Sequence, residues 1–381
     1  MAMDNICDYA LCERYFGMKR SMYDSAVKVL EWLRADQVGS VALAQLDDVV
    51  IRRNNVPAAA ALVERLRAHA GTFYLPNLQQ GEDMALAAVL VDLLPKAIDM
   101  LHDLGIPDPV LQATLHDFAI WADVYQEKTG REGINETEWN LLFLTGRILR
   151  IGRLQYESFT FLEPYYVYRS RYSGDFVVLV SSDVRVSADG IPLASAAPDS
   201  QEQFVTQLHS DGVTVTGNVA DTVTGTIRRE QVSLALAGYE LVLAPGMPAT
   251  NMHIPADGPL IPGSVDESIA QAVPLLTSLG RCTPVAVCES WLLDPALVSI
   301  AHPESNICHF MHRFAKFPNP RPGSAIVERV CGWGADRLPV DELPERTSLQ
   351  RGLKQYLLAG GTVRDVSGVV PLTMPTQKEK D

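Results

Sequence analysis

The sequence predicts an α+β protein, in which an all-helical N-terminal domain precedes a domain of mixed strands and helices. Up to about Leu144, apolar residues recur every three to four positions, as they do on the buried face of a helix. From Ile148 onward apolar and polar residues alternate, which is typical of half-buried strands. After Ile254 predicted helices and strands follow one another in turn.

Helical periodicity is clearest in two N-terminal segments. The apolar residues of 111–125 share one face, which predicts a single helix over Pro109–Lys128. A second stripe covers 86–101, where Pro95 predicts a kink or a break. Further helices are expected over Cys7–Phe16, Tyr23–Arg34 and Pro57–His69.

Period-two alternation predicts the strands of the second domain. One strand should cover Ile148–Glu157. The stretch Ser181–Ser210 is rich in Ser, Asp, Ala, Pro and Gly, so it predicts a long surface loop with a short helix. The remaining strands are expected at Tyr165–Arg169, Phe176–Val180, Gly212–Thr216, Gln231–Leu236, Tyr239–Ala244 and Ala249–Ile254.

Two helix-start signals mark the last third of the chain. Ser264-x-x-Glu267 has the pattern of a capping box, so a helix should begin at Ser264. Thr347-x-x-Gln350 has the same pattern. Around them we expect strands at Pro284–Ser290, Ala325–Cys331 and Thr362–Val370, and helices at Glu304–Arg313 and Thr347–Leu358.

The change of pattern near residue 146 divides the chain. We expect a helical domain over residues 1–145, a mixed-sheet domain over 146–372 and a disordered tail over 373–381. In a chain of 381 residues, both domains are long enough to bury a core of their own.

Composition argues against several classes of function. The 32 basic and 46 acidic residues give a net charge of −14, which disfavours binding to nucleic acid. Apolar runs stay far below the roughly 18 residues of a membrane span. Six cysteines without CxxC pairs, together with the lack of a secretory signal pattern, predict a cytoplasmic protein that acts on a small molecule. The oligomeric state is not predicted.

A basic stretch interrupts the acidic sequence. Residues 146–173 contain five arginines, at positions 147, 150, 153, 169 and 171, against two glutamates. They could attract a phosphorylated ligand. They could equally pair with acidic residues of the helical domain, and the sequence leaves both readings open.

The segment Thr250–Ser264 contains the most informative pattern. A predicted strand ends, a Pro- and Gly-rich turn follows, and a helix begins. Free N–H groups at a helix start favour anions, and Gly258 and Gly263 allow close approach of a ligand to the backbone. His253, one residue before the strand's end, is a candidate general base. The alternative is a histidine that is hydrogen-bonded within the sheet.

A second polar group ends the strand Pro284–Ser290. Glu289 and Ser290 follow a buried-type run, and a carboxylate there is costly to bury without a partner, so Glu289 is a candidate base or substrate anchor. Cys288 could instead be a nucleophile, although cysteines in strands are mostly small core residues. The histidines near Cys308 lack the HExxH pattern, and we expect no metal.

Arg153, Gln155 and Glu157 alternate along the predicted strand Ile148–Glu157, so they should share one face of it. Three polar groups in line indicate either a solvated face or one wall of a polar pocket. We treat them as candidate substrate-binding residues, together with Trp291.

Four motifs in chain order resemble a bacterial family of N-acyltransferases. They are Gly152-Arg-Leu-Gln-Tyr-Glu157, His253-Ile-Pro-x-x-Gly-Pro-Leu260, Cys288-x-Ser-Trp-Leu-Leu-Asp-Pro295 and Ser305-Asn-Ile-x-x-Phe310. Members of this family join an all-helical N-acyltransferase N-terminal domain to a GNAT-like C-terminal domain. The resemblance spans nearly the whole chain.

The resemblance implies a splayed mixed sheet that holds acyl-CoA between two central strands. By analogy these strands are Ala249–Ile254 and Pro284–Ser290, and the helix after the first would hold the pyrophosphate. Backbone amides near Met252 and Ile254 would face the thioester carbonyl. The other candidate donor-binding residues are Gly258, Leu260, Gly263 and Ser264.

The resemblance further implies direct transfer of an acyl group to a small amine, with His253 or Glu289 as the base and Ser290 nearby. The usual Gly-rich pyrophosphate loop is replaced by Pro255-Ala-Asp-Gly-Pro-Leu-Ile-Pro-Gly263, which includes the acidic Asp257. This departure favours an alternative, a non-catalytic ligand-binding or regulatory module on the same fold. A third possibility is a cysteine hydrolase that uses Cys288.

Overall fold

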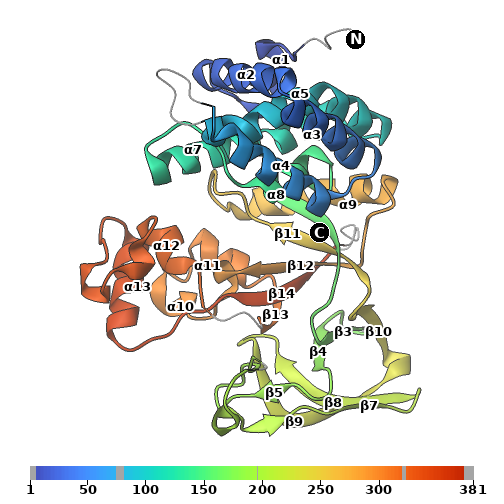
Figure 1. Ribbon diagram of the computed structural model, residues 1–381. Helices are drawn as coiled ribbons and strands as arrows, with labels where there is room; N and C mark the ends of the chain where they lie inside the picture. Colours follow the sequence, from blue (N-terminus) through green and yellow to red (C-terminus); the bar gives the residue numbers. More distant parts are fainter. Residues whose placement is uncertain (1–5, 74–80, 195, 320–322, 373–381) are drawn as a thin grey trace. The chain divides into compact units, whose positions relative to one another are not determined.

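The computed structural model describes residues 6–73, 81–194, 196–319 and 323–372 (Figure 1). It divides into two units, one of residues up to 157 together with 254–258, the other of residues 158–253 together with those from 259 onward. A helical region precedes a region of mixed sheet, so the predicted α+β class is confirmed. The tail predicted over 373–381 lies outside the described residues.

The first unit is a helical bundle around α5 (Gly81–Asp103), whose apolar residues are almost entirely buried. Helix α5 contacts both α2 and α4. Pro95 lies inside α5, which continues to Asp103, so of the predicted kink or break the break does not occur. The other helices are α1 (Tyr9–Phe16), α2 (Arg20–Ala35), α3 (Gln37–Asp47), η1 (Asp48–Arg52), α4 (Val56–Ala70), α6 (Asp108–Leu115), α7 (Asp117–Thr129) and α8 (Thr137–Leu144).

Two predictions in the first unit need correction. The single helix expected over Pro109–Lys128 is two helices, α6 and α7, separated at His116. The single strand expected over Ile148–Glu157 is a hairpin of β1 (Ile148–Ile151) and β2 (Leu154–Thr160), with Ile151 paired to Leu154. Its two-residue turn contains Gly152 at φ +62°, a conformation that glycine adopts without strain.

In the second unit, one group of strands has the order β11-β12-β14-β13. Strand β12 (Val285–Ser290) pairs in parallel with β11 (Pro248–His253) and antiparallel with β14 (Val366–Pro371). Strand β13 (Ala315–Pro318), which the sequence did not predict, pairs with β14. Because β12 lies between two partners, its residues Val285 to Cys288 are buried.

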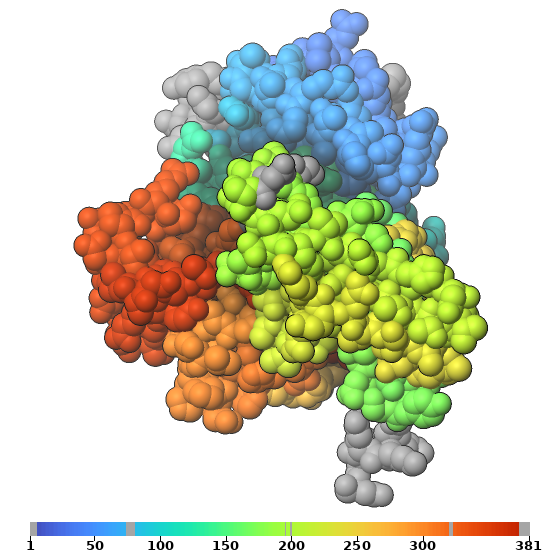
Figure 2. Space-filling view, turned by 90° about the horizontal axis from the view of Figure 1, so that it is seen from below, coloured from blue at the N-terminus to red at the C-terminus, as the bar shows by residue number. Residues whose placement is uncertain are grey.

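The second sheet has the order β10-β3-β4-β8-β7, with β9 paired to β8. A buried cluster joins it to the first group of strands, with Tyr165 and Val178 from this sheet against Val287, Phe317 and Val369. Figure 2 shows these strands as a continuous yellow-green surface beside the red surface of the C-terminal helices. The bounds are β3 (Tyr165–Ser170), β4 (Phe176–Val180), β7 (Leu208–Ser210), β8 (Thr214–Asp221), β9 (Thr226–Ala235) and β10 (Tyr239–Leu243); β5 (Arg185–Val186) and β6 (Phe204–Val205) form a separate pair.

Helices cover the remaining C-terminal sequence. The strand predicted over Ala325–Cys331 is wrong, because α12 (Ile326–Cys331) is helical and packs its apolar residues against α13 (Ser348–Leu358). The capping box at Thr347 is confirmed. The one predicted at Ser264 is wrong, because α9 (Pro262–Ser278) begins two residues earlier. Short helices complete this region: α10 (Leu297–Ile300) and α11 (Asn306–Met311).

Candidate functional site

The parallel strands β11 and β12 pair over only part of their length. Thr250 pairs with Ala286 and Asn251 with Val287, whereas β11 continues to His253 and β12 to Ser290. Asn251 and Val287 are the last residues at which these two strands pair with each other. The last two residues of β11 and the last three of β12 therefore lie beyond the positions at which these two strands pair.

His253 and Glu289 project from the same face of the sheet. Each lies two positions beyond the paired residues Asn251 and Val287, and side chains two apart in a strand point the same way. The His253 side chain is half-buried and that of Glu289 is exposed. On β14, Ser367 is the partner of Glu289. The structure thus brings the two predicted bases to one face at the ends of adjacent strands, beyond the residues through which β11 and β12 pair with each other.

Cys288 occupies a different environment from its neighbour Glu289. It points to the opposite face of β12, is fully buried and is paired with Gly368 of β14. Burial, followed by the nearby carboxylate of Glu289, raises the pKa of the Cys288 thiol. A nucleophilic cysteine needs access and a lowered pKa, so this environment is unfavourable to the cysteine hydrolase reading.

Ser290 and Trp291 end β12 and begin a short 3₁₀ helix, η4 (Trp291–Leu293). The Ser290 hydroxyl accepts a hydrogen bond from the backbone N–H of Leu292, with an O–N distance of 3.1 Å, so it caps this helix. The Trp291 ring is half-buried and packs against the apolar cluster of the C-terminal helices. Both residues therefore have local structural roles in addition to their predicted roles at the site.

The segment between β11 and α9 is an exposed bend with buried ends. Ala256 to Pro259 are exposed, while Pro255 and Leu260 are buried. Gly258 has φ +75°, and nothing lies within 4 Å of the position that a Cβ would occupy there. The same open space surrounds Gly263 in the first turn of α9. These two glycines leave the backbone accessible, as predicted for contact with a ligand.

Around this bend, the other predicted donor-binding residues differ in accessibility. Met252 and Leu260 are buried, and Ile254 is half-buried. The Ser264 hydroxyl donates to the carbonyl of Ile261 over 2.8 Å instead of accepting from the helix N–H groups. Pro262 at the start of the helix explains the difference, because its fixed φ suits the first helical position and moves the helix start forward.

Two arginines of the β1–β2 hairpin contact the bend. Arg153 donates through Nη2 to the carbonyls of Pro255 and Gly258, over 3.1 and 2.7 Å. Arg150 pairs with Asp257, with an N–O distance of 2.8 Å. Burial lowers the pKa of Arg153, but an arginine stays charged at neutral pH. Two of the five arginines in the basic stretch, Arg150 and Arg153, thus contact the segment that follows β11.

Of the three residues predicted to share a face, only Gln155 and Glu157 do so, because they lie two positions apart in β2. Arg153 lies in the hairpin turn and not in a strand. The Gln155 side chain is buried and donates to Asp117 over 2.6 Å, and Glu157 pairs with Arg147 at 3.4 Å. Each of the three alternating polar residues thus contacts a different part of the chain.

Asp117 was not predicted from the sequence. It is buried at the start of α7, and besides Gln155 it accepts hydrogen bonds from the indole N–H groups of Trp121 and Trp139. Burial raises its pKa and these hydrogen bonds oppose the shift. The sequence signal for this site was a polar residue within an apolar helical stripe.

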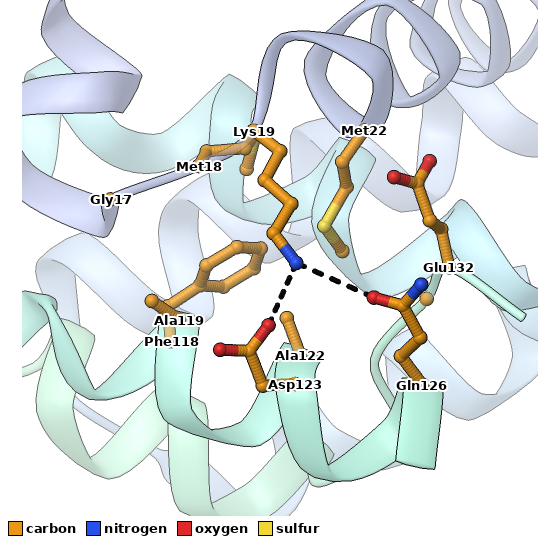
Figure 3. Close-up of a pocket in the computed structure, with 11 residues that line it drawn as sticks. Gly17, Met18, Lys19, Met22, Phe118, Ala119, Ala122, Asp123, Gln126 and Glu132 are labelled. Carbon is orange, nitrogen blue, oxygen red and sulfur yellow. Dashed lines mark hydrogen bonds and ion pairs between the residues drawn. The ribbon is translucent and has the colours of Figure 1, made fainter. Parts of the chain in front are cut away.

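A pocket lies within the helical unit, between the start of α2 and α7 (Figure 3). Its floor is apolar, with Met18, Met22 and Phe118, and Lys19 crosses its mouth to Asp123 and Gln126 over 2.8 and 3.4 Å. The predicted site residues are not among those that line it. Within the part of the chain that the structure describes, no cluster of three or more His, Cys, Asp or Glu could hold a metal ion.

The fold and the comparisons define the class of the protein as a two-domain acyltransferase with a GNAT-like domain. Residues 148–370 match the GNAT-like C-terminal domain family, and residues 24–146 match the N-acyltransferase N-terminal domain family. The chain belongs to the family with the GNAT-like C-terminal domain and has the two-domain N-acyltransferase architecture. The expected family resemblance is confirmed.

Several solved structures share this fold. An acyltransferase in complex with decanoyl-CoA and teicoplanin has a TM-score of 0.51 and 21% identity, covering 82% of this chain and 77% of its own. An acyltransferase in complex with CoA and 10C-teicoplanin has a TM-score of 0.51 and 21% identity, covering 83% and 79%. A mutant acyltransferase in complex with octanoyl-CoA has a TM-score of 0.51 and 19% identity, covering 96% and 99%.

No curated protein shows significant similarity to the chain. Among the described residues, no helix combines the length and the apolar character needed to cross a membrane.

Proposed function

We propose that the protein transfers an acyl group from acyl-CoA to an amine. The observation that carries this proposal is the end of the β11–β12 pairing at Asn251 and Val287, with His253 and Glu289 on one face beyond it. A donor is proposed to lie beside the ends of these two strands, beyond the residues that pair them with each other. Family membership supports the proposal, since the chain matches an N-acyltransferase N-terminal domain family and a GNAT-like C-terminal domain family.

The reaction requires a base near the ends of β11 and β12. The acceptor nitrogen attacks the thioester carbonyl, a C–N bond forms, and the C–S bond breaks to release the CoA thiolate. The attacking amine must lose a proton, and His253 or Glu289 receives it. The released thiolate then takes up a proton. Both candidates share one face, so the same substrate position serves either of them.

The segment after β11 is proposed to bind the phosphates of the donor. Gly258 and Gly263 leave open space around the backbone, and the start of α9 supplies N–H groups and a positive dipole end. Backbone amides at Met252 and Ile254 are proposed to stabilise the negative charge that develops on the thioester oxygen. Leu260 and Ser264 would then line the donor site.

For the acceptor we propose a small amine in the first place. Trp291, Gln155 and Glu157 stay predictions as acceptor contacts. Each already has a partner within the protein: the C-terminal apolar cluster, Asp117 and Arg147, respectively. The acyltransferases of similar fold were crystallised with octanoyl- and decanoyl-CoA and with teicoplanin. A medium-length acyl chain and a glycopeptide acceptor are therefore included in the test. Cytoplasmic location, predicted from the cysteines, also stays a prediction.

Calorimetric titration with CoA, acetyl-CoA and decanoyl-CoA tests the donor. Micromolar binding, about −8 kcal/mol, is expected for at least one of them. Preference for decanoyl-CoA would indicate a medium-length donor, and a coupled thiol-release assay with small amines and with teicoplanin would then identify the acceptor class. Lack of binding to all three would overturn the proposal and leave the non-catalytic module as the better reading of the fold.

A further inference from the structure

The acidic side chain of Asp257 is unfavourable for binding an anion at its position. It lies in the exposed bend between β11 and α9, next to Gly258, in the segment proposed to bind the donor phosphates. A carboxylate beside a pyrophosphate repels it, and the repulsion is strongest where little water screens the charges. An acidic residue in this bend therefore needs compensation if the segment binds an anion.

Arg150 supplies that compensation. Its guanidinium lies 2.8 Å from the Asp257 carboxylate, and its side chain is only 14% exposed whereas that of Asp257 is 44% exposed. A partly buried pair of this kind is screened less than a surface pair. The charge of the carboxylate is thus balanced by a residue of the hairpin.

Arg153 acts on the backbone of the same bend. One guanidinium nitrogen, Nη2, bridges the carbonyl oxygens of Pro255 and Gly258. The bridge fixes the separation of two residues that flank Asp257 and turns their carbonyls toward the hairpin. Carbonyl oxygens would repel a phosphate, so turning them away leaves the bend better suited to an anion. The β1–β2 hairpin supplies both arginines, Arg150 from strand β1 and Arg153 from the turn.

We propose that Arg150 and Arg153 are positioning residues of the donor-binding bend: Arg150 neutralises Asp257 and Arg153 fixes the backbone on either side of it. This inference rests on the proposed function, because it names the bend as the phosphate site. It also gives Arg153 a different role from the substrate contact predicted from the sequence.

The test is a mutant cycle on Arg150 and Asp257, with steady-state kinetics for acyl-CoA and calorimetric titration of CoA. Arg150→Ala should raise the KM for acyl-CoA and the Kd for CoA about tenfold, with kcat within about twofold, since an uncompensated carboxylate then faces the phosphates. Asp257→Asn should leave both constants nearly unchanged. The double variant should return to within about threefold of the wild type.

The double variant separates positioning from direct contact. If Arg150 itself binds phosphate, removing Asp257 cannot restore binding, and the double variant stays as weak as Arg150→Ala. That result would overturn the inference, as would a loss of donor binding above fivefold in Asp257→Asn. The second variant keeps the test informative if Arg150→Ala does not fold.

Arg153→Ala tests the backbone bridge in the same way. It should raise the KM for the donor and leave the KM for the acceptor unchanged. A rise confined to the acceptor KM would overturn the inference and restore the substrate-contact assignment. Arg228→Ala is the matched control, because it also removes an arginine from an aspartate pair, with Asp221. If the wild type binds no CoA species, the proposed function fails instead, independently of the cycle.

Discussion

The Asp117 carboxylate accepts a hydrogen bond from the Gln155 amide, with an O–N distance of 2.6 Å, and both side chains are buried. This contact joins helix α7 to strand β2 inside the first unit. With the two indole N–H groups on Asp117, three donors depend on one carboxylate. Buried donors that lose their acceptor are costly, so the network stabilises the unit mainly by being complete.

Asp117→Ala should destabilise the protein by about 3 kcal/mol, because the buried Gln155 amide and two part-buried indole N–H groups lose their acceptor. Asp117→Asn should cost no more than about 1 kcal/mol, since its amide oxygen can accept from the indoles while Gln155 turns its own oxygen toward the new amide. Urea unfolding measures both. Asp123→Ala, at an exposed carboxylate, is the control and should change stability little. Equal losses for the two Asp117 variants would contradict this account.

Lys316 is buried on β13, and burial lowers its pKa to about 8. The unfolded chain holds this proton up to a higher pH, so the charged lysine destabilises the fold at neutral pH. The penalty is full below about pH 8 and disappears as the pH rises through the ordinary lysine pKa of about 10.4. Lys316→Met should therefore stabilise the protein at pH 7 by up to about 3 kcal/mol, and the gain should shrink above pH 8.

Denaturant unfolding at pH 7 and pH 9.5 tests the Lys316 prediction. The exposed Lys28 of α2 provides the control, because Lys28→Met should not produce a pH-dependent gain. A gain for Lys316→Met that is the same at both pH values would mean that packing, and not the buried charge, explains it.

Replacing either candidate base should lower turnover without unfolding the sheet. His253→Ala or Glu289→Gln should reduce kcat by about 100-fold if that residue receives the acceptor proton. Glu240→Gln, at an exposed glutamate of β10, is the matched control. Unchanged turnover in both site variants, with the thermal unfolding midpoint preserved, would remove His253 and Glu289 from the mechanism.

Cys288 should resist iodoacetamide in the native protein, because its thiol is buried and its pKa is raised. The half-buried Cys282 and Cys331 are internal controls that should react first. Peptide mass spectrometry of the labelled protein gives the order. Early labelling of Cys288 accompanied by loss of activity, with Cys288→Ala inactive, would revive the cysteine hydrolase reading.

The sequence predicted the helical and mixed-sheet regions because periodicity is a local property. It failed where local patterns are ambiguous. Ala325–Cys331 contains Ile326, Val327 and Val330, which suit a strand, yet these residues pack as one side of a short helix against α13. In Ile148–Glu157 the alternation continues through Gly152, so a hairpin has the same pattern as one strand.

The candidate site was predictable only in part, for a related reason. His253 and Glu289 could be placed near the ends of their strands from the sequence, but their common face depends on the register between β11 and β12, which the structure supplies. The roles of Arg150 and Arg153 could not be predicted, since their partners in the bend are about one hundred positions away. Gln155 was a candidate substrate-binding residue, and its actual partner, Asp117, is likewise remote in the sequence.

The unequal pairing of β12 also bears on how this fold could change specificity over time. Six cross-strand pairs tie β12 to β14, whereas two pairs tie it to β11. Side chains at His253 and Glu289 lie outside the β11–β12 pairs and outside the buried cluster. Under the proposed function, the two residues that carry the chemistry are therefore separate from the strand pairs and the buried cluster that hold the sheet together.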